Sequence, residues 1–110
     1  MRAFAVSALL LALVPAPSRL LVEATEFRFT LSRTTVKPGP AILQLAIRGE
    51  DPHDLRVRRI GSRASVSSVP ETLPGRVAEW RGRLKRGRYE LYCSLPGHKK
   101  AGMRAVLTVK

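Results

Sequence analysis

The sequence of 110 residues contains one cysteine and only two histidines. A single cysteine has no partner for an intramolecular disulfide, so a small scaffold stapled by disulfides is excluded. A structural zinc site takes four ligands, mostly cysteine and histidine, and three such residues cannot complete a zinc finger. Because these side chains are so few, the position of each one is informative.

Acidic and aromatic residues are also scarce: 8 Asp and Glu stand against 20 Lys and Arg, for a formal net charge of +12, and aromatics make up 5%. The hydrophobic fraction of 45% is too high for a disordered basic tail. The basic residues are not interleaved with aromatics, and no recognition-helix or RNA-binding signature is present, so we do not expect a nucleic-acid partner. The composition is that of one ordinary globular domain.

The first 16 residues differ from the rest of the chain. Arg2 gives a short positive start, residues 3–14 form an unbroken run of small and apolar side chains, and Ala16 ends a small-residue cleavage motif. This pattern is typical of a secretory signal peptide, and it predicts a mature domain of residues 17–110 that works outside the cytoplasm, in the periplasm or at the cell exterior. A retained membrane anchor is the less favoured alternative, because the apolar run is short for a bilayer.

Beyond the leader, apolar and polar residues alternate with a period of two. The pattern is clear around residues 27–31, 43–47, 53–57, 88–93 and 103–109, and Pro- and Gly-containing turns separate several of these segments. Short strands with frequent turns predict an all-β domain, either an antiparallel sandwich or a barrel. Residues 62–68 lack such a pattern, and we expect a flap or a short edge strand there.

The same alternation assigns side chains to faces. It places Cys93 with Tyr89 and Leu91 on an inward face, and it places His53 and Met103 inward on their own segments. Three possible metal ligands therefore lie at the ends of strands and point into the domain.

His98 lies on the turn between Cys93 and Met103. These three residues and His53 are the chain's only soft or imidazole ligands apart from the initiator methionine. Two imidazoles, one thiolate and a distant thioether are the ligand set of a blue copper electron-transfer centre. An inert buried thiol, a structural histidine at the turn and simple core packing of the methionine are the alternatives, and the spacing of the three C-terminal residues favours the metal site.

Residues 89–103, with the sequence YELYCSLPGHKKAGM, resemble the copper-binding loop of the cupredoxins, and GEDPHDL at residues 49–55 is similar to the segment that bears the family's first histidine. The resemblance covers about residues 26–109. It implies a Greek-key β-sandwich of about seven to eight strands. It also implies one mononuclear type 1 copper, held strongly by His53, Cys93 and His98 and weakly by Met103.

Cupredoxins usually have Asn where this chain has Asp54. We expect Asp54 to take over as a clamp between the two ligand segments, with its carboxylate accepting from the hydroxyl or the backbone N–H of Ser94. Its own backbone N–H would point toward the sulfur of Cys93. In the alternating pattern Asp54 falls on the outward face of its strand, which argues against this role.

The resemblance implies an extracytoplasmic protein that carries single electrons between redox proteins. We do not expect an enzyme, because a copper enzyme would need further histidines for a second copper site. We expect a monomer. Two alternatives stay open: a copper storage or delivery protein on the same fold, and a basic secreted binding module in which the ligand pattern is accidental.

Electrons are expected to pass through the edge of His98, where Leu95 and Pro96 contribute a small apolar rim. Lys99 and Lys100 flank this edge, and the basic surface predicts steering toward an acidic redox partner or an anionic membrane surface. A merely solvated basic surface is the alternative. Tyr92 faces outward by parity and is a candidate aromatic contact for a partner.

Overall fold

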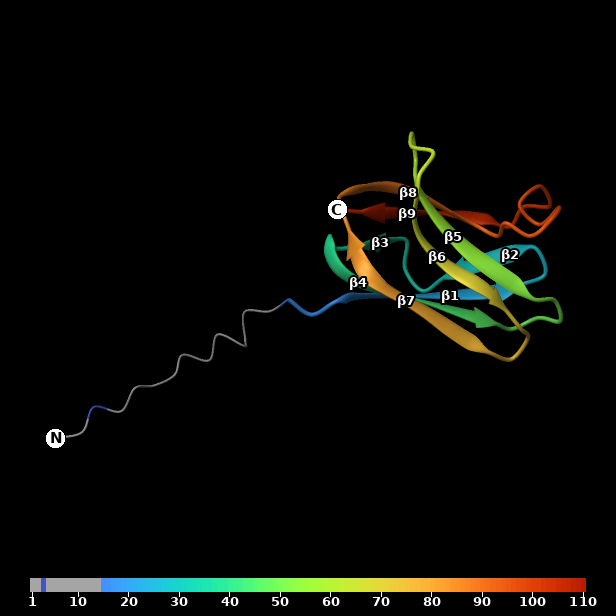
Figure 1. The fold of residues 1–110 in the computed structure, drawn as a ribbon, viewed down its shortest axis with the longest axis horizontal. Helices are drawn as coiled ribbons and strands as arrows, with labels where there is room; N and C mark the ends of the chain where they lie inside the picture. Colours follow the sequence, from blue (N-terminus) through green and yellow to red (C-terminus); the bar gives the residue numbers. More distant parts are fainter. Residues whose placement is uncertain (1–2, 4–14) are drawn as a thin grey trace.

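The structure is a computed structural model that describes residue 3 and residues 15–110. Nine strands lie in this part of the chain (Figure 1): β1 (Ser18–Thr25), β2 (Arg28–Leu31), β3 (Thr35–Val36), β4 (Gly39–Ile47), β5 (His53–Arg59), β6 (Ser65–Thr72), β7 (Val77–Leu84), β8 (Gly87–Tyr92) and β9 (Arg104–Val109). Among the described residues, no helix is long and apolar enough to cross a membrane. The predicted signal peptide falls almost wholly outside the described residues, and its cleavage stays a prediction.

The strands form two sheets. The first has four strands in the order β2-β1-β4-β7, and the second has five in the order β3-β9-β8-β5-β6. β1 pairs with β4 and β3 pairs with β9 in parallel, whereas the other neighbours are antiparallel. The predicted all-β sandwich is confirmed, with two differences: both sheets are mixed, and two short strands raise the number of described strands to nine.

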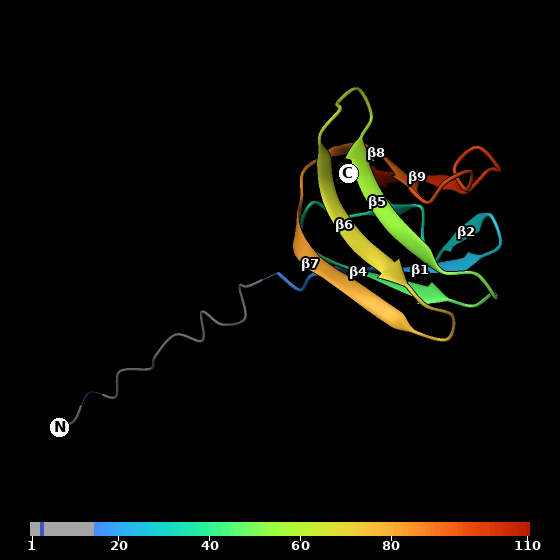
Figure 2. The ribbon, with the colours of Figure 1, turned by 45° about the vertical axis from the view of Figure 1, so that its right-hand side comes forward.

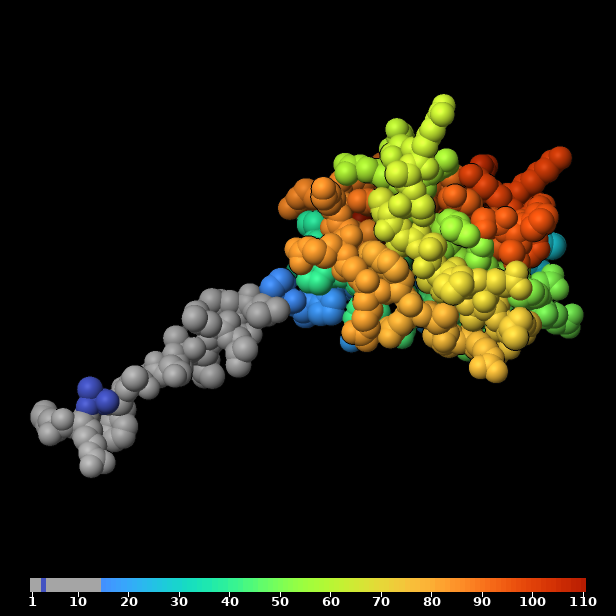
Figure 3. Space-filling model, in the orientation of Figure 1, coloured from blue at the N-terminus to red at the C-terminus, as the bar shows by residue number. Residues whose placement is uncertain are grey.

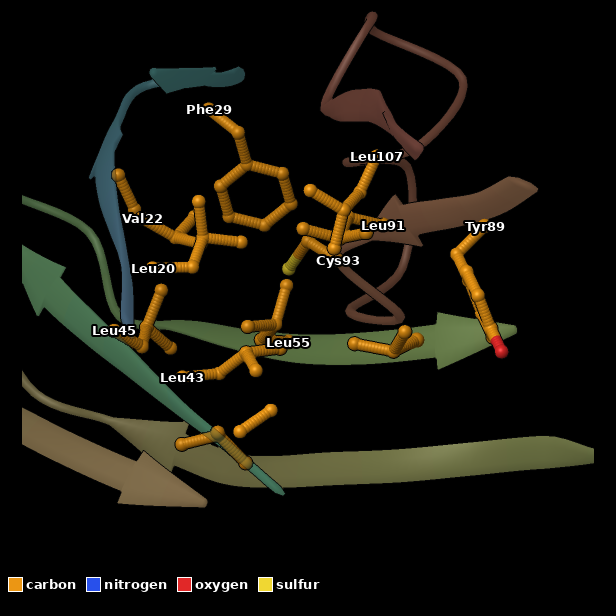
Figure 4. Packing of buried hydrophobic residues seen from close by; sticks show 14 of the residues in the cluster. Leu20, Val22, Phe29, Leu43, Leu45, Leu55, Tyr89, Leu91, Cys93 and Leu107 are labelled. Atoms are coloured by element: carbon orange, nitrogen blue, oxygen red, sulfur yellow. The ribbon is translucent and has the colours of Figure 1, made fainter. Parts of the chain in front are cut away.

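The space between the sheets is filled by the apolar positions of the alternating strands. Figure 4 shows part of this core, in which Leu20, Val22, Leu43 and Leu45 come from the first sheet and Leu55, Leu91 and Leu107 from the second. Full burial of a leucine-sized side chain stabilises a fold by about 1.5–3 kcal/mol, so the alternation decides which face of each strand packs inward. Cys93 belongs to the same cluster, and its sulfur points toward the core, as the alternation predicts.

Two edge strands follow β5, and the first of them, β6, overlaps residues 62–68, where a flap or a short edge strand was expected. β6 lies at the edge of the five-stranded sheet, and its pairing with β5 shifts register twice, which blurs the alternation that a regular strand shows. β7 was not predicted; its inward positions include Ala78 and Gly82, which carry little apolar signal. Trp80, between them on the same face, is partly buried against the core.

Four connections gather at one end of the sandwich, one of them the β6–β7 turn at residues 73–76, which is hydrogen-bonded to the end of β4. The other three are the β1–β2 turn, the β4–β5 turn at residues 48–52 and the loop at residues 93–103 between β8 and β9, and the C terminus lies at the other end (Figures 1 and 2). In the space-filling view the β8–β9 loop forms a lobe at the surface of this end (Figure 3). The predicted metal ligands lie on or beside two of these connections, the β4–β5 turn and the β8–β9 loop.

Candidate metal centre

Strand ends bring the predicted ligands together. His53 begins β5 and Cys93 directly follows β8, and these two strands are antiparallel neighbours with Arg56 opposite Tyr92. The loop that carries His98 is closed by two backbone hydrogen bonds. The N–H of Cys93 donates to the carbonyl of Met103 at 3.2 Å, and the N–H of Met103 donates to the carbonyl of His98 at 3.1 Å.

Three donor atoms converge beneath this loop. Nδ1 of His53 lies 3.2 Å from Nδ1 of His98, and the sulfur of Cys93 lies 3.5 Å from Nδ1 of His98 and 4.0 Å from Nδ1 of His53. Both imidazoles therefore turn the same ring nitrogen toward the thiol. His53 and Cys93 are fully buried, whereas His98 is only partly buried.

Met103 is the fourth residue of the predicted set. Its side chain is fully buried, and its backbone forms hydrogen bonds with the backbones of both Cys93 and His98. A set of two imidazoles, a thiol and a thioether suits copper, because thiolate and thioether favour Cu(I) and imidazole accepts both oxidation states. The residues present fit such an ion.

Burial sets the protonation of the donors. Burial raises the pKa of the Cys93 thiol, an effect that the backbone N–H groups of Asp54 and Leu95 partly oppose. Burial, and then the nearby His98, lower the pKa of His53. Both shifts favour the uncharged forms, the neutral imidazole and the protonated thiol, and a bound metal ion would displace the thiol proton.

Asp54 joins the start of β5 to the ligand loop. Its Oδ1 accepts from the backbone N–H of Ser94 at 2.6 Å, and its Oδ2 accepts from the Ser94 hydroxyl. The Nε of Arg56 lies 3.6 Å from Oδ2. Asp54 is buried, at 3% exposed, although parity predicted an outward side chain. The difference arises because Ser94 and Arg56 cover the carboxylate on that side.

Sequence patterns missed Phe27 as a neighbour of the site. It was expected in a strand with Phe29, but it lies in the β1–β2 turn with a left-handed φ of 59°. The residue is 41% exposed, and its ring contacts the His98 ring edge-on, with 5.0 Å between centroids. The turn reverses the chain, and this reversal carries the phenylalanine away from the core.

Glu26, beside it, was also missed. Its Oε1 accepts from the backbone N–H groups of Glu50 at 2.7 Å and Asp51 at 2.8 Å, so it links the β1–β2 turn to the β4–β5 turn. The same hydrogen bonds, that of Asp51 above all, lower the pKa of Glu26. Oε1 also lies 4.0 Å from Nε2 of His53. No motif signals this contact, because it joins residues on separate turns.

The two lysines of the loop have different surroundings. Nζ of Lys99 donates to Oε1 of Glu90 at 2.9 Å and lies 4.3 Å from the ring centroid of Tyr92. Glu90 also accepts from Arg58 at 2.7 Å. Lys100 is exposed and has no acidic partner among residues 15–110. Lys99 is therefore held against the sheet by its ion pair with Glu90, whereas the ammonium group of Lys100 has no such ion pair within residues 15–110.

The outer side of the loop is hollowed. A groove of about 610 Å³ runs beside it, and its lining includes Tyr92, Leu95, Pro96, Lys100 and Arg104. Pro96 is exposed, and Leu95 is partly buried against the core. The residues predicted to meet a partner therefore line one continuous surface next to the ligand loop.

The sequence matches no protein-family profile and no curated protein. The fold, by contrast, is similar to solved structures. The dithionite-reduced auracyanin of the photosynthetic bacterium Roseiflexus castenholzii matches with a TM-score of 0.72 at 14% identity, over 87% of this chain and 99% of that chain. Auracyanin A of Chloroflexus aurantiacus, a "blue" copper protein, matches at 0.71 and 13% identity, over 86% of this chain and all of that chain. An azurin of Methylomonas sp. strain J matches at 0.68 and 14%, over 86% and 99%.

These similarities show that the chain has the cupredoxin fold, as the resemblance of its loop implied. The arrangement of His53, Cys93, His98 and Met103 matches that of a type 1 copper site. The chain therefore contains a site compatible with one mononuclear copper ion.

Proposed function

We propose that the protein binds one type 1 copper ion and carries single electrons between redox partners. The observation that supports this most directly is the convergence of the Cys93 sulfur with Nδ1 of His53 and His98 at a buried point. Bound copper would supply reversible exchange of one electron. The chain holds the ligands in a packed core beneath a hydrogen-bonded loop, and such rigidity keeps rearrangement small when the charge changes.

His98 is the proposed path for electrons. It is the one ligand of the four that is not buried, so a partner can approach its ring edge more closely than the other ligands. Leu95, Pro96 and Phe27 supply apolar surface on the ligand loop and against the His98 ring, which suits a transient contact. Lys100 contributes positive charge on the same loop.

We further propose that the protein is not an enzyme and acts as a monomer outside the cytoplasm. A second copper site would need more imidazole ligands, and the sequence has only the two histidines already used. The leader-like first 16 residues support export.

Storage or delivery of copper on the same fold is the second candidate, and the thiolate ligand is the observation against it. The test is a visible spectrum of the purified, copper-loaded protein. We expect an intense thiolate-to-copper band in the red that disappears in Cys93→Ser. A colourless wild-type protein with a full equivalent of Cu(II) would exclude the type 1 site, and absence of stoichiometric copper would favour a binding module without a metal.

A further inference from the structure

The imidazole of His53 leaves one ring nitrogen without a partner. The ring is fully buried, and Nδ1 faces Cys93 and His98, but Nε2 has no hydrogen-bond partner among the described residues. A neutral imidazole carries one proton, which sits on either nitrogen. A proton on Nδ1 would block the nitrogen that faces the other donors.

A carboxylate is held on the Nε2 side of the ring. Oε1 of Glu26 lies 4.0 Å from Nε2, and the backbone N–H groups of Glu50 and Asp51 fix this oxygen. Approach by about 1 Å brings the pair into hydrogen-bond range. The anchoring turn runs directly into His53, so the carboxylate and the ring are held from the same segment.

Gly49 makes room for this carboxylate. A Cβ at position 49 would lie 2.3 Å from Oε1 of Glu26 and 2.4 Å from Oε2. These distances are too short for non-bonded atoms, so any other residue at this position would force the Glu26 carboxylate to move. The contact is thus shaped by two turns: the β1–β2 turn carries Glu26, and the β4–β5 turn supplies both Gly49 and the two backbone N–H groups.

We infer that Glu26 is a positioning residue for His53: its carboxylate accepts the Nε2–H and so keeps the Nδ1 lone pair aimed at Cys93 and His98. This rests on the proposed function in assigning the lone pair to copper. Carboxylates that accept from the far nitrogen of a ligand histidine fix its tautomer and raise its basicity. The negative charge also favours the more positive, oxidised state of a redox metal held there, and it lowers the reduction potential.

Two substitutions separate the charge from the hydrogen bond. Glu26→Gln keeps a carbonyl oxygen for the same backbone N–H groups and for Nε2 but removes the charge, whereas Glu26→Ala removes both. Gly49→Ala displaces the carboxylate without altering it. Glu23→Gln is the matched control, since Glu23 pairs with Arg48 and not with His53.

The first measurement needs no metal. Imidazole ¹⁵N chemical shifts of the metal-free full-length protein, taken at a pH where His53 is neutral, report its tautomer. We expect the Nε2–H form in the wild type, Glu26→Gln and Glu23→Gln, and a mixture of tautomers in Glu26→Ala and Gly49→Ala. An unchanged tautomer in both of the last two variants would overturn the inference and leave Glu26 as a cap of the β4–β5 turn.

The second measurement uses Cu(II) itself. We expect Glu26→Ala to lower Cu(II) affinity by about 10–100-fold, the usual range for loss of a ligand's outer partner. Glu26→Gln should keep most of the affinity but raise the reduction potential, and Glu23→Gln should change neither. Equal potentials in wild type and Glu26→Gln would contradict the electrostatic role. Should the wild type bind no copper, the proposed function fails, while the tautomer experiment still decides the role of Glu26.

Discussion

Asp54 accepts two hydrogen bonds from Ser94, one from its backbone N–H at 2.6 Å to Oδ1 and one from its hydroxyl to Oδ2. The two residues lie 40 positions apart. Asp54 directly follows His53 in β5, and Ser94 directly follows Cys93 in the ligand loop, so the contact holds His53 and Cys93 in register.

The first prediction concerns this clamp. Asp54→Ala should cost about 1–3 kcal/mol of unfolding free energy in the metal-free protein, because it leaves the N–H of Ser94 without its acceptor. Copper affinity should fall and the copper spectrum should broaden. Asp54→Asn retains an acceptor oxygen and should restore most of both. Urea unfolding and Cu(II) titration measure these effects, and an Asp54→Ala protein with wild-type stability and spectrum would show that the clamp is dispensable.

The second prediction tests Met103. Met103→Leu conserves volume and should cost less than about 1.5 kcal/mol in stability. Copper should stay bound, because the thioether is the weak ligand, and the reduction potential should rise. Spectroelectrochemistry of the loaded variant measures this. Complete loss of copper would instead mean that Met103 is a principal ligand.

The third prediction separates backbone strain at Phe27 from its ring. Phe27→Gly and Phe27→Ala remove the same aromatic contact with His98, but only glycine adopts the left-handed φ of 59° without cost. The glycine variant should therefore be more stable than the alanine variant by about 1 kcal/mol. Thermal unfolding of the two metal-free proteins gives the comparison. Equal stabilities would mean that the turn relaxes when the ring is removed.

The ligand set was predictable from the sequence because its members are scarce and lie on regular elements. Cys93 follows a strand with clean alternation, His53 begins another, and His98 and Met103 follow at fixed spacings. Two-residue periodicity is a local property, and it correctly orients side chains within a strand. The all-β sandwich was predictable for the same reason.

The residues around the ligands were harder to predict from the sequence, because their contacts join separate turns. Glu26 bonds to Asp51 across 25 positions, and Phe27 reaches His98 from a turn whose left-handed residue has no sequence signal. Asp54 has the outward parity that was predicted to expose it, and only the folded loop buries it. Periodicity does not report which loop covers an outward face.

The fourth prediction follows from the lowered pKa of Glu90, whose largest cause is the hydrogen bond from Lys99, with Arg58 contributing. A carboxyl whose pKa is depressed on folding stabilises the protein at neutral pH, and this stability is lost as the pH falls below the ordinary value of 4.5 toward the folded pKa. Glu90→Gln should therefore lower stability at neutral pH and flatten its loss in acid. Unfolding midpoints of the metal-free protein across this range measure it, with Glu79→Gln, which pairs with Arg81 on β7, as the control.

The last prediction assigns the two loop lysines different roles. Lys99 is held by Glu90, whereas Lys100 is exposed beside the groove that Arg104 also lines. Lys100→Gln should therefore slow electron transfer with an anionic reagent such as hexacyanoferrate, and Lys99→Gln should slow it less while costing up to about 1 kcal/mol in stability.

The effect of Lys100 should be confined to association. Exposed charges are screened beyond about 8 Å at physiological ionic strength, so the rate with the anionic reagent should fall as salt rises and the difference between the variants should shrink. A cationic reagent, such as tris(phenanthroline)cobalt(III), should show the opposite salt dependence. The copper spectrum should not move, because neither lysine is a ligand. Stopped-flow kinetics measure the rates with both reagents as the salt concentration is varied, and an absorption spectrum of each variant checks the copper site. Rates that are indifferent to salt and to Lys100→Gln would assign the positive charge to solubility alone and leave the apolar surface of Leu95 and Pro96 as the docking contact.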